Sequence, residues 1–402
     1  MKKIVFTVAA LLTFVTARAQ LKPDETTAYE ARQLKVAEIN FVSSYYSQDG
    51  NRSAITGGIG TEKLTDFANS FDLTLSKTDR LGRQHTFNLD VNIDYYTSAS
   101  SDNIDPLTVS SASKSDVHIY PSVSWRVFDP KSRITKGVSY AYSTEYDYRS
   151  HGFTAQFAKL SADRNREVSL RASAFLDTYD AILPSELRPS YYGSGAENDR
   201  VRVDSKPRNS FNLALSVSQV INKRLQLLAM VEPSYQEGLL STPFHRVYFT
   251  NAAVTTEKLP GTRLKFPVSL RANYFQGDRA ILRSFYRFYI DDWGMVAHTA
   301  SVEVAVKLTP FLSVSPFYRF HKQAAVDYFR PYRQHSPTQT YYTSDYDIGT
   351  MTTQFIGSGI RYAPPGGIMG IRGWNAFELR YGHYLRSTGM TANSITMMMK
   401  VK

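Results

Sequence analysis

The stretch Phe87-Asn88-Leu89-Asp90-Val91-Asn92-Ile93-Asp94-Tyr95 alternates an apolar residue with a polar one at every position. Successive side chains of a β-strand point to opposite faces, so the pattern predicts a strand with one apolar and one polar face. A second stretch, from Val168 to Leu176, alternates in the same way, with Phe175 as its one exception. Strands with two such different faces favour a sheet that separates an apolar environment from a polar one.

This period-2 pattern recurs along most of the chain. Together with the two stretches above, it predicts about 16 strands. The others are expected near residues 37–47, 64–77, 114–127, 134–147, 150–162, 208–221, 224–236, 263–275, 281–291, 296–308, 311–323, 350–363, 370–385 and 391–402.

The connections between these strands fall into two classes. Every second connection is short and rich in turn residues, as in Asp79-Arg80-Leu81-Gly82, whereas four of the intervening connections are long. The long ones lie near residues 97–113, 178–207, 237–262 and 324–349. Since only helices and closed barrels satisfy every backbone polar group in lipid, this asymmetry predicts an all-β fold: a transmembrane antiparallel β-barrel with short periplasmic turns and long extracellular loops. A large soluble β-sandwich is the alternative, but it does not account for the asymmetry.

The N-terminus is typical of an exported protein. Lys2 and Lys3 precede an apolar run, residues 4–15, and Ala17-Arg18-Ala19 resembles a signal-peptidase site. We therefore expect a signal peptide at 1–19, a periplasmic segment at 20–36 and the barrel at 37–402. The expected location is the cell outer membrane, with its lipid as the first partner.

Composition agrees with this interpretation. Tyr and Phe together account for 50 residues and cysteine is absent, so disulfides and thiol catalysis are excluded. Aromatic rings are also expected at the outer ends of upward strands, where they would lie at the lipid–water interface. These are Tyr45, Tyr95, Tyr146, Tyr179, Tyr235, Trp293, Tyr318 and Tyr384. The formal net charge is +11, but the basic residues are dispersed over turns and strands, and we do not expect nucleic-acid binding.

Several blocks of the sequence resemble those of one bacterial family. They are Thr242-Pro243-Phe244-His245-Arg246-Val247-Tyr248-Phe249, Tyr286-Arg287-Phe288-Tyr289 with Asp291-Asp292-Trp293-Gly294, Pro316-Phe317-Tyr318-Arg319, and Arg380-Tyr381-Gly382-His383-Tyr384. On these blocks the chain is similar to domain-of-unknown-function family 3570, an uncharacterised outer-membrane β-barrel family. The resemblance implies an outer-membrane location and carries no reaction, substrate or catalytic residue.

The polar faces of the strands predict a charged lumen. If apolar residues face lipid, early strands turn acidic residues inward and later strands turn arginines inward, which would place a field across the pore. The candidate lumen residues are Asp90, Asp94, Glu145, Glu167, Arg271, Arg283, Arg287 and Arg319. The alternative is that these charges pair with one another and only solvate a filled barrel.

One long loop carries a cluster that could fold inward and constrict the channel: Phe244, His245 and Arg246. The leading functional hypothesis is therefore a pore or binding barrel for a small polar solute. The second is a barrel plugged by its loops that anchors or couples a periplasmic or surface protein partner. The third, ranked low, is an outer-membrane hydrolase, for which His383 is the residue to replace.

No sequence motif supports a cofactor or a catalytic centre. The chain has no Walker loop, dinucleotide fingerprint, nucleophile elbow or H-E-x-x-H, so we expect no catalytic, cofactor-binding or metal-binding residues. The segment 341–347 is acidic and aromatic and could hold calcium through its oxygens, although solvation is the simpler role. Metal binding would require residues from separate strands or loops to converge.

Overall fold

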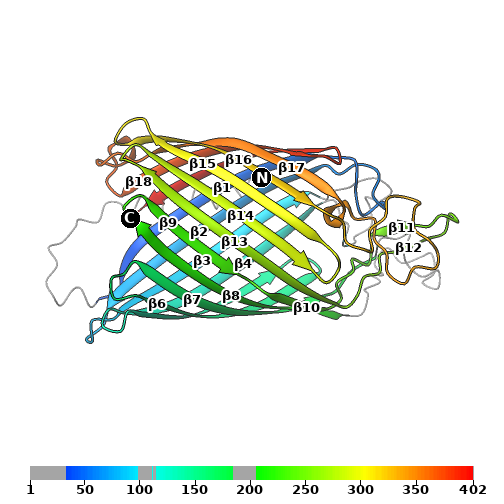
Figure 1. Ribbon diagram of the computed structural model, residues 1–402, viewed down its shortest axis with the longest axis horizontal. Helices are drawn as coiled ribbons and strands as arrows, with labels where there is room; N and C mark the ends of the chain where they lie inside the picture. The colour runs from blue at the N-terminus through cyan, green and yellow to red at the C-terminus, as the bar shows by residue number, and fades with distance from the viewer. Residues whose placement is uncertain (1–32, 98–110, 112–114, 184–204, 402) are drawn as a thin grey trace.

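The computed structural model describes residues 33–97, 111, 115–183 and 205–401, in which the chain forms a closed antiparallel β-barrel (Figure 1). The strands of the barrel are β1 (Lys35–Asp49), β2 (Leu64–Thr78), β3 (Gln84–Thr97), β4 (Ser115–Asp129), β5 (Ile134–Thr144), β6 (Tyr148–Leu160), β7 (Arg166–Tyr179), β8 (Lys206–Asn222), β9 (Leu225–Val231), β10 (Ser234–Gly238), β13 (Thr262–Gln276), β14 (Ala280–Asp291), β15 (Val296–Lys307), β16 (Leu312–Gln323), β17 (Met351–Tyr362), β18 (Trp374–Arg386) and β19 (Met390–Val401). The predicted fold class is confirmed.

Two of these segments are halves of one strand. Both β9 and β10 pair with β8 and β13, and Glu232-Pro233 separates them. Proline has no backbone N–H to donate to the ladder, which explains the break. When β9 and β10 are counted as one strand, the described residues form a barrel of 16 strands. β1 pairs with β19 from Ile39–Val401 to Asp49–Thr391, which closes the barrel.

The strand boundaries differ from the predicted ones by a few residues. β1 begins at Lys35 rather than residue 37, and β18 begins at Trp374 rather than near residue 370. Gly370 and Gly373 have φ angles of 75° and 101°, a left-handed backbone that belongs to a turn and not to a strand. The predicted signal peptide at 1–19, most of the predicted periplasmic segment 20–36, and most of the long loops near 97–113 and 178–207 lie outside the described residues.

The apolar face of the sheet is the outer one. On β7, Leu170 is 44% exposed and lies between Phe157 of β6 and Leu215 of β8, both also exposed. The neighbouring Ser169 points the other way, and its Oγ hydrogen-bonds Ser216 Oγ at 2.6 Å. A band of exposed aliphatic and aromatic side chains around a polar interior is the arrangement that a lipid environment requires. Among the described residues, no helix is long and apolar enough to cross a membrane.

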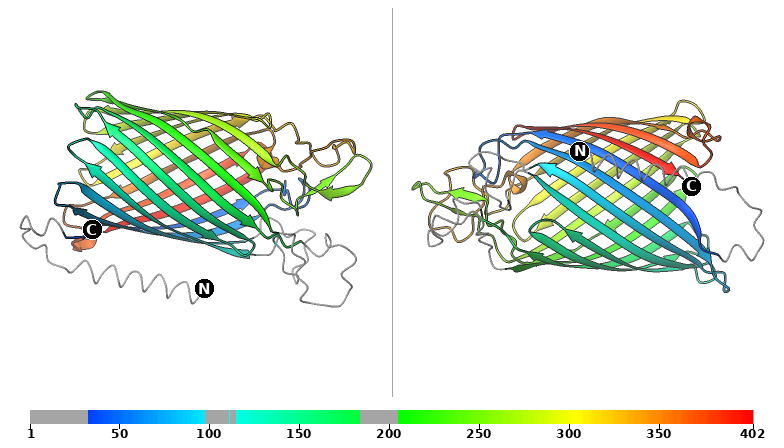
Figure 2. Two further views of the ribbon diagram at one scale, coloured as in Figure 1. Left: turned by 90° about the horizontal axis from the view of Figure 1, so that it is seen from below. Right: turned by 180° about the vertical axis from the view of Figure 1, so that it is seen from behind.

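The two ends of the barrel differ, as the sequence predicts (Figures 1 and 2). Short turns such as 79–83, 130–133, 223–224 and 277–279 join the strands at one end. The opposite end carries the loops 50–63, 239–261 and 324–350 and the turn 292–295, which together we name the cap. The loop 239–261 contains a hairpin of β11 (Arg246–Tyr248) and β12 (Val254–Thr256), and the loop 324–350 contains the 3-10 helix η3 (Tyr346–Ile348). A second 3-10 helix, η4 (Ile368–Gly370), lies in the turn before β18.

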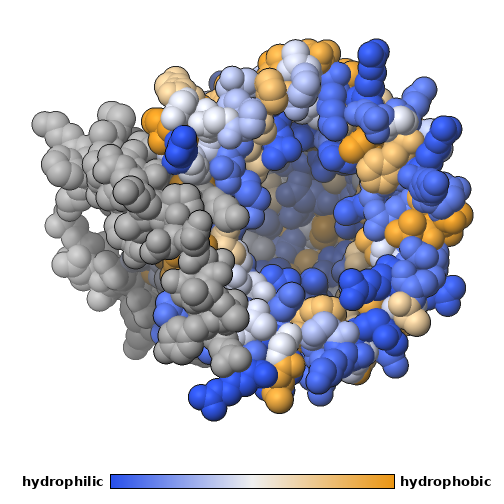
Figure 3. Space-filling view, turned by 90° about the vertical axis from the view of Figure 1, so that its left-hand side faces the viewer, coloured by the Kyte–Doolittle hydropathy of each residue, from blue (hydrophilic) through white to orange (hydrophobic). Residues whose placement is uncertain are grey.

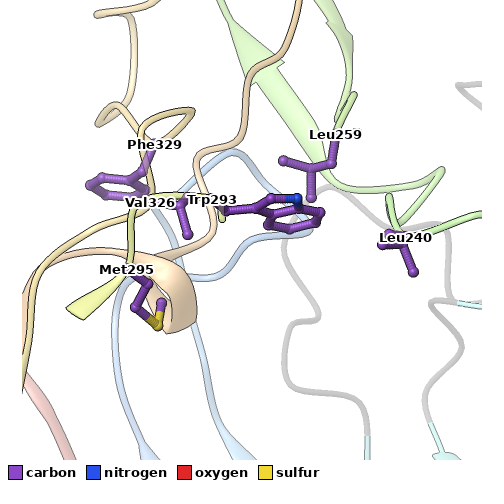
Figure 4. Close-up of a cluster of buried hydrophobic side chains, with 6 residues drawn as sticks. All are labelled: Leu240, Leu259, Trp293, Met295, Val326 and Phe329. Carbon is purple, nitrogen blue, oxygen red and sulfur yellow. The ribbon is translucent and has the colours of Figure 1, made fainter. Parts of the chain in front are cut away.

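The cap has a hydrophobic core of its own (Figure 4). Its buried members are Leu240, Leu259, Trp293, Met295, Val326 and Phe329. Trp293 is only 3% exposed, and its Nε1 donates to the carbonyl of Thr262 at 2.9 Å. The expectation that Trp293 lies at the lipid interface is therefore wrong: the turn 292–295 directs its ring into the cap, where loops distant in sequence bury it.

Two of the tyrosines expected at the interface also face away from lipid. Tyr384 lies opposite Phe355 on the inner face, and Tyr179 is paired with Tyr148 at the end of β6. By contrast, Tyr45 is 48% exposed and Tyr95 is 43% exposed, as an interfacial ring requires. Position near a strand end therefore does not determine whether a tyrosine side chain faces the lipid or the lumen. The alternation of side chains within each strand determines it.

Candidate functional site

One inner wall of the barrel is acidic. Asp72 of β2 lies directly opposite Asp90 of β3 in the ladder, and Asp90 Oδ2 accepts a hydrogen bond from Ser122 Oγ at 3.1 Å. Asp94 Oδ2 accepts from the hydroxyl of Tyr120 at 2.9 Å. No ion pair joins these three carboxylates to a cation within the described residues. Asp72 accepts from the side-chain amides of Asn40 and Asn88, so this acidic wall is solvated by neutral amide and hydroxyl groups.

The two other acidic candidates lie away from this group. Glu145 is in the loop between β5 and β6, where its Oε1 is 3.3 Å from His118 Nδ1. Burial raises the pKa of Glu145, against the opposing effect of His118. Glu167 lies at the start of β7, near the short-turn end, and pairs with Ser218. The acidic candidates thus extend along the barrel from the loop end to the turn end.

The four arginine candidates converge on one cavity of about 840 Å³ in the opposite wall. Arg271 comes from β13, Arg283 and Arg287 from β14, and Arg319 from β16, all at inward positions of the ladder. The cavity volume falls within the range that small-molecule sites occupy. Space-filling atoms at the short-turn end surround a deep hollow lined largely by hydrophilic residues (Figure 3).

Two further charged residues, absent from the sequence-based candidates, line this cavity. Glu303 of β15 accepts from Arg283 Nη1 at 2.5 Å and from Arg380 Nη2 of β18 at 2.6 Å. Glu303 alternates regularly with apolar neighbours in β15, so its facing could have been inferred. Its bond to Arg380, 77 residues away, could not, because that contact depends on how β15 and β18 approach across the lumen.

The other three arginines of the cavity have no carboxylate partner in the part of the chain that the structure describes. Within the described residues, no ion pair involves Arg271, Arg287 or Arg319. The guanidinium of Arg319 lies 4.9 Å from the centroid of the Phe355 ring and that of Arg271 lies 5.8 Å from Phe285. Such ring contacts hold a cation without neutralising it. The cavity lining holds five arginines and one glutamate, a formal charge of +4.

The acidic and basic walls face each other across the barrel. When β9 and β10 count as one strand, β3 and β14 are eight strands apart in a ring of sixteen, which is half its circumference. Asp90 and Asp94 on β3 therefore lie opposite Arg283 and Arg287 on β14. Fixed charges of opposite sign on facing walls create a field across the lumen, with the low dielectric of the barrel wall strengthening it.

The three residues expected to constrict the channel lie in the cap, and none of them lines the arginine cavity. Arg246 is 5% exposed and its Nη1 donates to the carbonyl of Ile55 at 2.6 Å, joining the hairpin to the loop 50–63. Phe244 contacts the His245 ring edge-on at 5.4 Å between centroids. Their role in constriction stays a prediction.

His245 belongs to a cluster that the sequence did not reveal. Its Nδ1 lies 3.9 Å from Glu257 Oε2 and 3.9 Å from Asp345 Oδ2. Burial raises the pKa of Asp345 to about 7, and the charge of Asp347 adds to the effect, while His245 opposes it. Asp345 falls in the acidic segment 341–347, but Glu257 and His245 come from the other loop, so only the folded cap brings a histidine and two carboxylates together.

His383, the residue named for the hydrolase hypothesis, faces outward on β18 between Leu379, Tyr381 and Leu385, all exposed. Its Nδ1 is 2.8 Å from Asn393 Oδ1. A side chain on the outer face of the barrel does not reach the lumen, so His383 and the arginine cavity are separate.

Comparison with solved structures finds bacterial outer-membrane barrels. The siderophore receptor PirA from Acinetobacter baumannii aligns over 87% of this chain and 53% of its own, with 10% identity and a TM-score of 0.47. A BenF-like porin from Pseudomonas fluorescens aligns over 90% of this chain and 98% of its own, with 9% identity and a TM-score of 0.43. The chain thus spans about half the length of the receptor. No curated protein matches it.

A family model gives the more specific result. The model for the protein of unknown function DUF3570 matches residues 4–367, which include every strand from β1 to β17. The match confirms the resemblance seen in the blocks around Phe244, Trp293 and Arg319. By this match over most of its length, the chain belongs to the DUF3570 family.

Proposed function

We propose that this protein lies in the outer membrane and that its lumen binds or passes a small anionic solute. The apolar outer band and the asymmetric ends support the membrane location. The observation that carries the choice of solute is the cavity in which Arg271, Arg287 and Arg319 have no carboxylate partner among the described residues. Excess positive charge in a confined polar space raises the local concentration of anions.

The acidic wall opposite the arginines would orient the solute. A solute that crosses between Asp90 and Arg287 experiences a transverse field, so a dipolar anion would be turned with its negative end toward β14. The 840 Å³ cavity admits a molecule of metabolite size. The chemical class we infer is therefore a small carboxylate or phosphate that also carries polar, uncharged groups.

Removing the unpaired arginines should lower anion selectivity. We expect the triple variant Arg271→Gln, Arg287→Gln, Arg319→Gln to shift the reversal potential in planar bilayers toward that of cations, with a several-fold fall in the anion-to-cation permeability ratio. Replacing Asp90 and Asp94 by Asn should shift it the other way. The two sets lie on opposite walls and share no contacts, so their effects should be roughly independent.

The matched control removes three positive charges at the short turns: Lys131→Gln, Lys223→Gln, Arg279→Gln. These residues are exposed and lie outside the cavity. The control should change selectivity much less than the cavity variant. Equal shifts in both variants, or an unchanged reversal potential in the cavity variant, would rule out the arginine cavity as the selectivity site.

A plugged barrel is the second candidate, and the cap favours it. Gln323 Nε2, on the inner wall, donates to the carbonyls of Asp347 and Gly349 at 2.9 and 2.7 Å, and Arg386 Nη1 donates to Asp347 Oδ1 at 2.7 Å. The loop 324–350 thus bends onto inward-facing side chains at the rim. A loop held in this way can close the extracellular mouth.

Deletion of residues 240–250 tests this candidate. The segment carries Leu240 of the cap core and Arg246, which holds the loop 50–63. We expect its removal to loosen the cap and to increase the single-channel conductance in planar bilayers. A deletion variant that stays folded, as judged by heat-modifiable migration on gels, and conducts no better than the wild type would exclude this segment as the plug.

A further inference from the structure

A group of metal-ligand side chains lies in the cap, apart from the arginine cavity. His245 immediately precedes β11, Glu257 immediately follows β12, and Asp345 is the N-cap residue of η3. One donor atom from each of the three lies within 4.8 Å of the others. The hairpin ends bring the first two together, and the packing of loop 324–350 against the hairpin adds the third.

His245 Nδ1 is buried and has no hydrogen-bond partner among the described residues. Its 3.9 Å distances to Glu257 Oε2 and Asp345 Oδ2 are too long for hydrogen bonds. Buried polar atoms of a native fold nearly always have a partner, so an exception that faces two carboxylate oxygens indicates a group bound between them.

The distances fit a metal ion. Zn²⁺ bonds nitrogen and oxygen at roughly 2.0–2.2 Å, which places tetrahedral ligand atoms roughly 3.4 Å apart. An ion between His245, Glu257 and Asp345 would therefore draw His245 Nδ1 closer to each of the two carboxylate oxygens by about 0.5 Å. One donor atom of each residue already lies within 4.8 Å of the others. Loop side chains can make a movement of this size without changing the strands.

Neighbouring groups orient the two carboxylates. Glu257 Oε1 accepts from the backbone N–H of Thr242 at 2.8 Å, and Oε2 accepts from Thr343 Oγ1. Asp345 Oδ1 accepts from the N–H of Asp347 at 2.8 Å, which leaves Oδ2 toward His245. Fixed outer partners of this kind are typical of metal ligands, because they hold the ligand atoms in position before the ion binds.

The burial and the charge of the cluster also favour a bound cation. The Glu257 side chain is 3% exposed, whereas those of His245 and Asp345 are 18% and 21% exposed, so the cluster is enclosed on one side and reachable from the other. Two close carboxylates repel each other in such a place unless a cation lies between them. Imidazole nitrogen is a ligand for Zn²⁺ and similar ions but not for Ca²⁺ or Mg²⁺, which take oxygen.

We propose that His245, Glu257 and Asp345 bind a divalent transition-metal ion of the Zn²⁺ class, which ties the loop 239–261 to the loop 324–350 in the cap. None of these three residues lines the arginine cavity. The second acidic group, Asp116, Glu145 and Asp147, offers only carboxylates and is the comparison site in the test.

The test is calorimetric titration of the full-length barrel, without a polyhistidine tag, in detergent after treatment with EDTA. We expect ZnCl₂ to bind in one equivalent and CaCl₂ to bind far more weakly. Asp345→Asn preserves shape and should weaken Zn²⁺ binding by at least about tenfold, since even changes to outer partners of a metal site have effects of that size. His245→Gln should do the same.

The controls are Asp327→Asn, an exposed aspartate of the same cap, and His383→Gln on the outer face. Both should keep wild-type affinity, and heat-modifiable migration verifies that each variant is folded. In the wild type, ZnCl₂ should also slow tryptic cleavage of the cap, and in Asp345→Asn it should not.

Three results would overturn the proposal. They are absence of saturable Zn²⁺ binding to the wild type, equal affinity in Asp345→Asn, and loss of binding in Asp116→Asn while Asp345→Asn retains it. Tighter binding of Ca²⁺ than of Zn²⁺ would overturn the assigned class of ion.

Discussion

Replacing Leu170 by arginine is expected to prevent normal assembly of the barrel. Leu170 is exposed on the outer face between Phe157 and Leu215, and an arginine at the middle of the lipid-facing band costs about 2–4 kcal/mol. Marginally stable folds lose much of their stability to a change of this size. The measurement is the free energy of unfolding in urea in the presence of lipid vesicles, together with the heat-modifiable fraction in membranes.

Ser169→Arg is the matched control, one residue away on the inner face. It loses the 2.6 Å contact with Ser216, but its guanidinium enters a polar lumen whose wall already carries Arg171. We expect this variant to assemble with a loss of about 1 kcal/mol, the value of one hydrogen bond. If both arginines were tolerated equally, or if Ser169→Arg were the worse, the assignment of the outer face would be wrong.

Asp291→Ala is expected to unfold the cap while leaving the strands paired. The Asp291 side chain is fully buried and is the centre of a network at the end of β14. Its Oδ2 accepts from Arg263 Nε at 2.9 Å and from the Tyr289 hydroxyl at 2.7 Å, and its Oδ1 accepts from the N–H groups of Trp293 and Met295, both at 3.0 Å. The variant leaves the charge of Arg263 buried and unpaired, at a cost of about 3–5 kcal/mol.

This cost should appear as local opening, because Trp293 and Met295 belong to the cap core and Arg263 also stacks on the Trp293 ring at 4.3 Å. Amide hydrogen exchange in the loops 239–261 and 324–350 should accelerate about a hundredfold or more, with the central strands unchanged. Asp292→Ala, at the adjacent exposed position, loses one bond to the N–H of Leu264 and should change exchange little. Similar exchange in the two variants would show that Asp291 does not hold the cap.

The strands were predictable because their signal is local. In a segment such as 87–95, apolar and polar residues alternate with the period of a strand, so facing, approximate length and the barrel class follow from adjacent residues alone. The same alternation predicts inward positions for Asp90, Asp94, Arg283 and Arg287, and their role in a solute path stays a prediction. Where the local signal weakens, as at Gly370 and Gly373, the predicted boundary was displaced by a few residues.

The tertiary structure alone determines the contacts that depend on closure of the barrel and on packing of the loops. Alternation places Glu303 and Arg380 on the inner face, but only the curvature of the wall from β15 to β18 brings them to 2.6 Å. Tryptophan is a residue type typical of the lipid–water interface. Trp293 is instead a core residue, because loops from three parts of the chain cover it. His245, Glu257 and Asp345 meet for the same reason. Loop side chains have no period, and their neighbours are set by long-range packing that the order of residues does not encode locally.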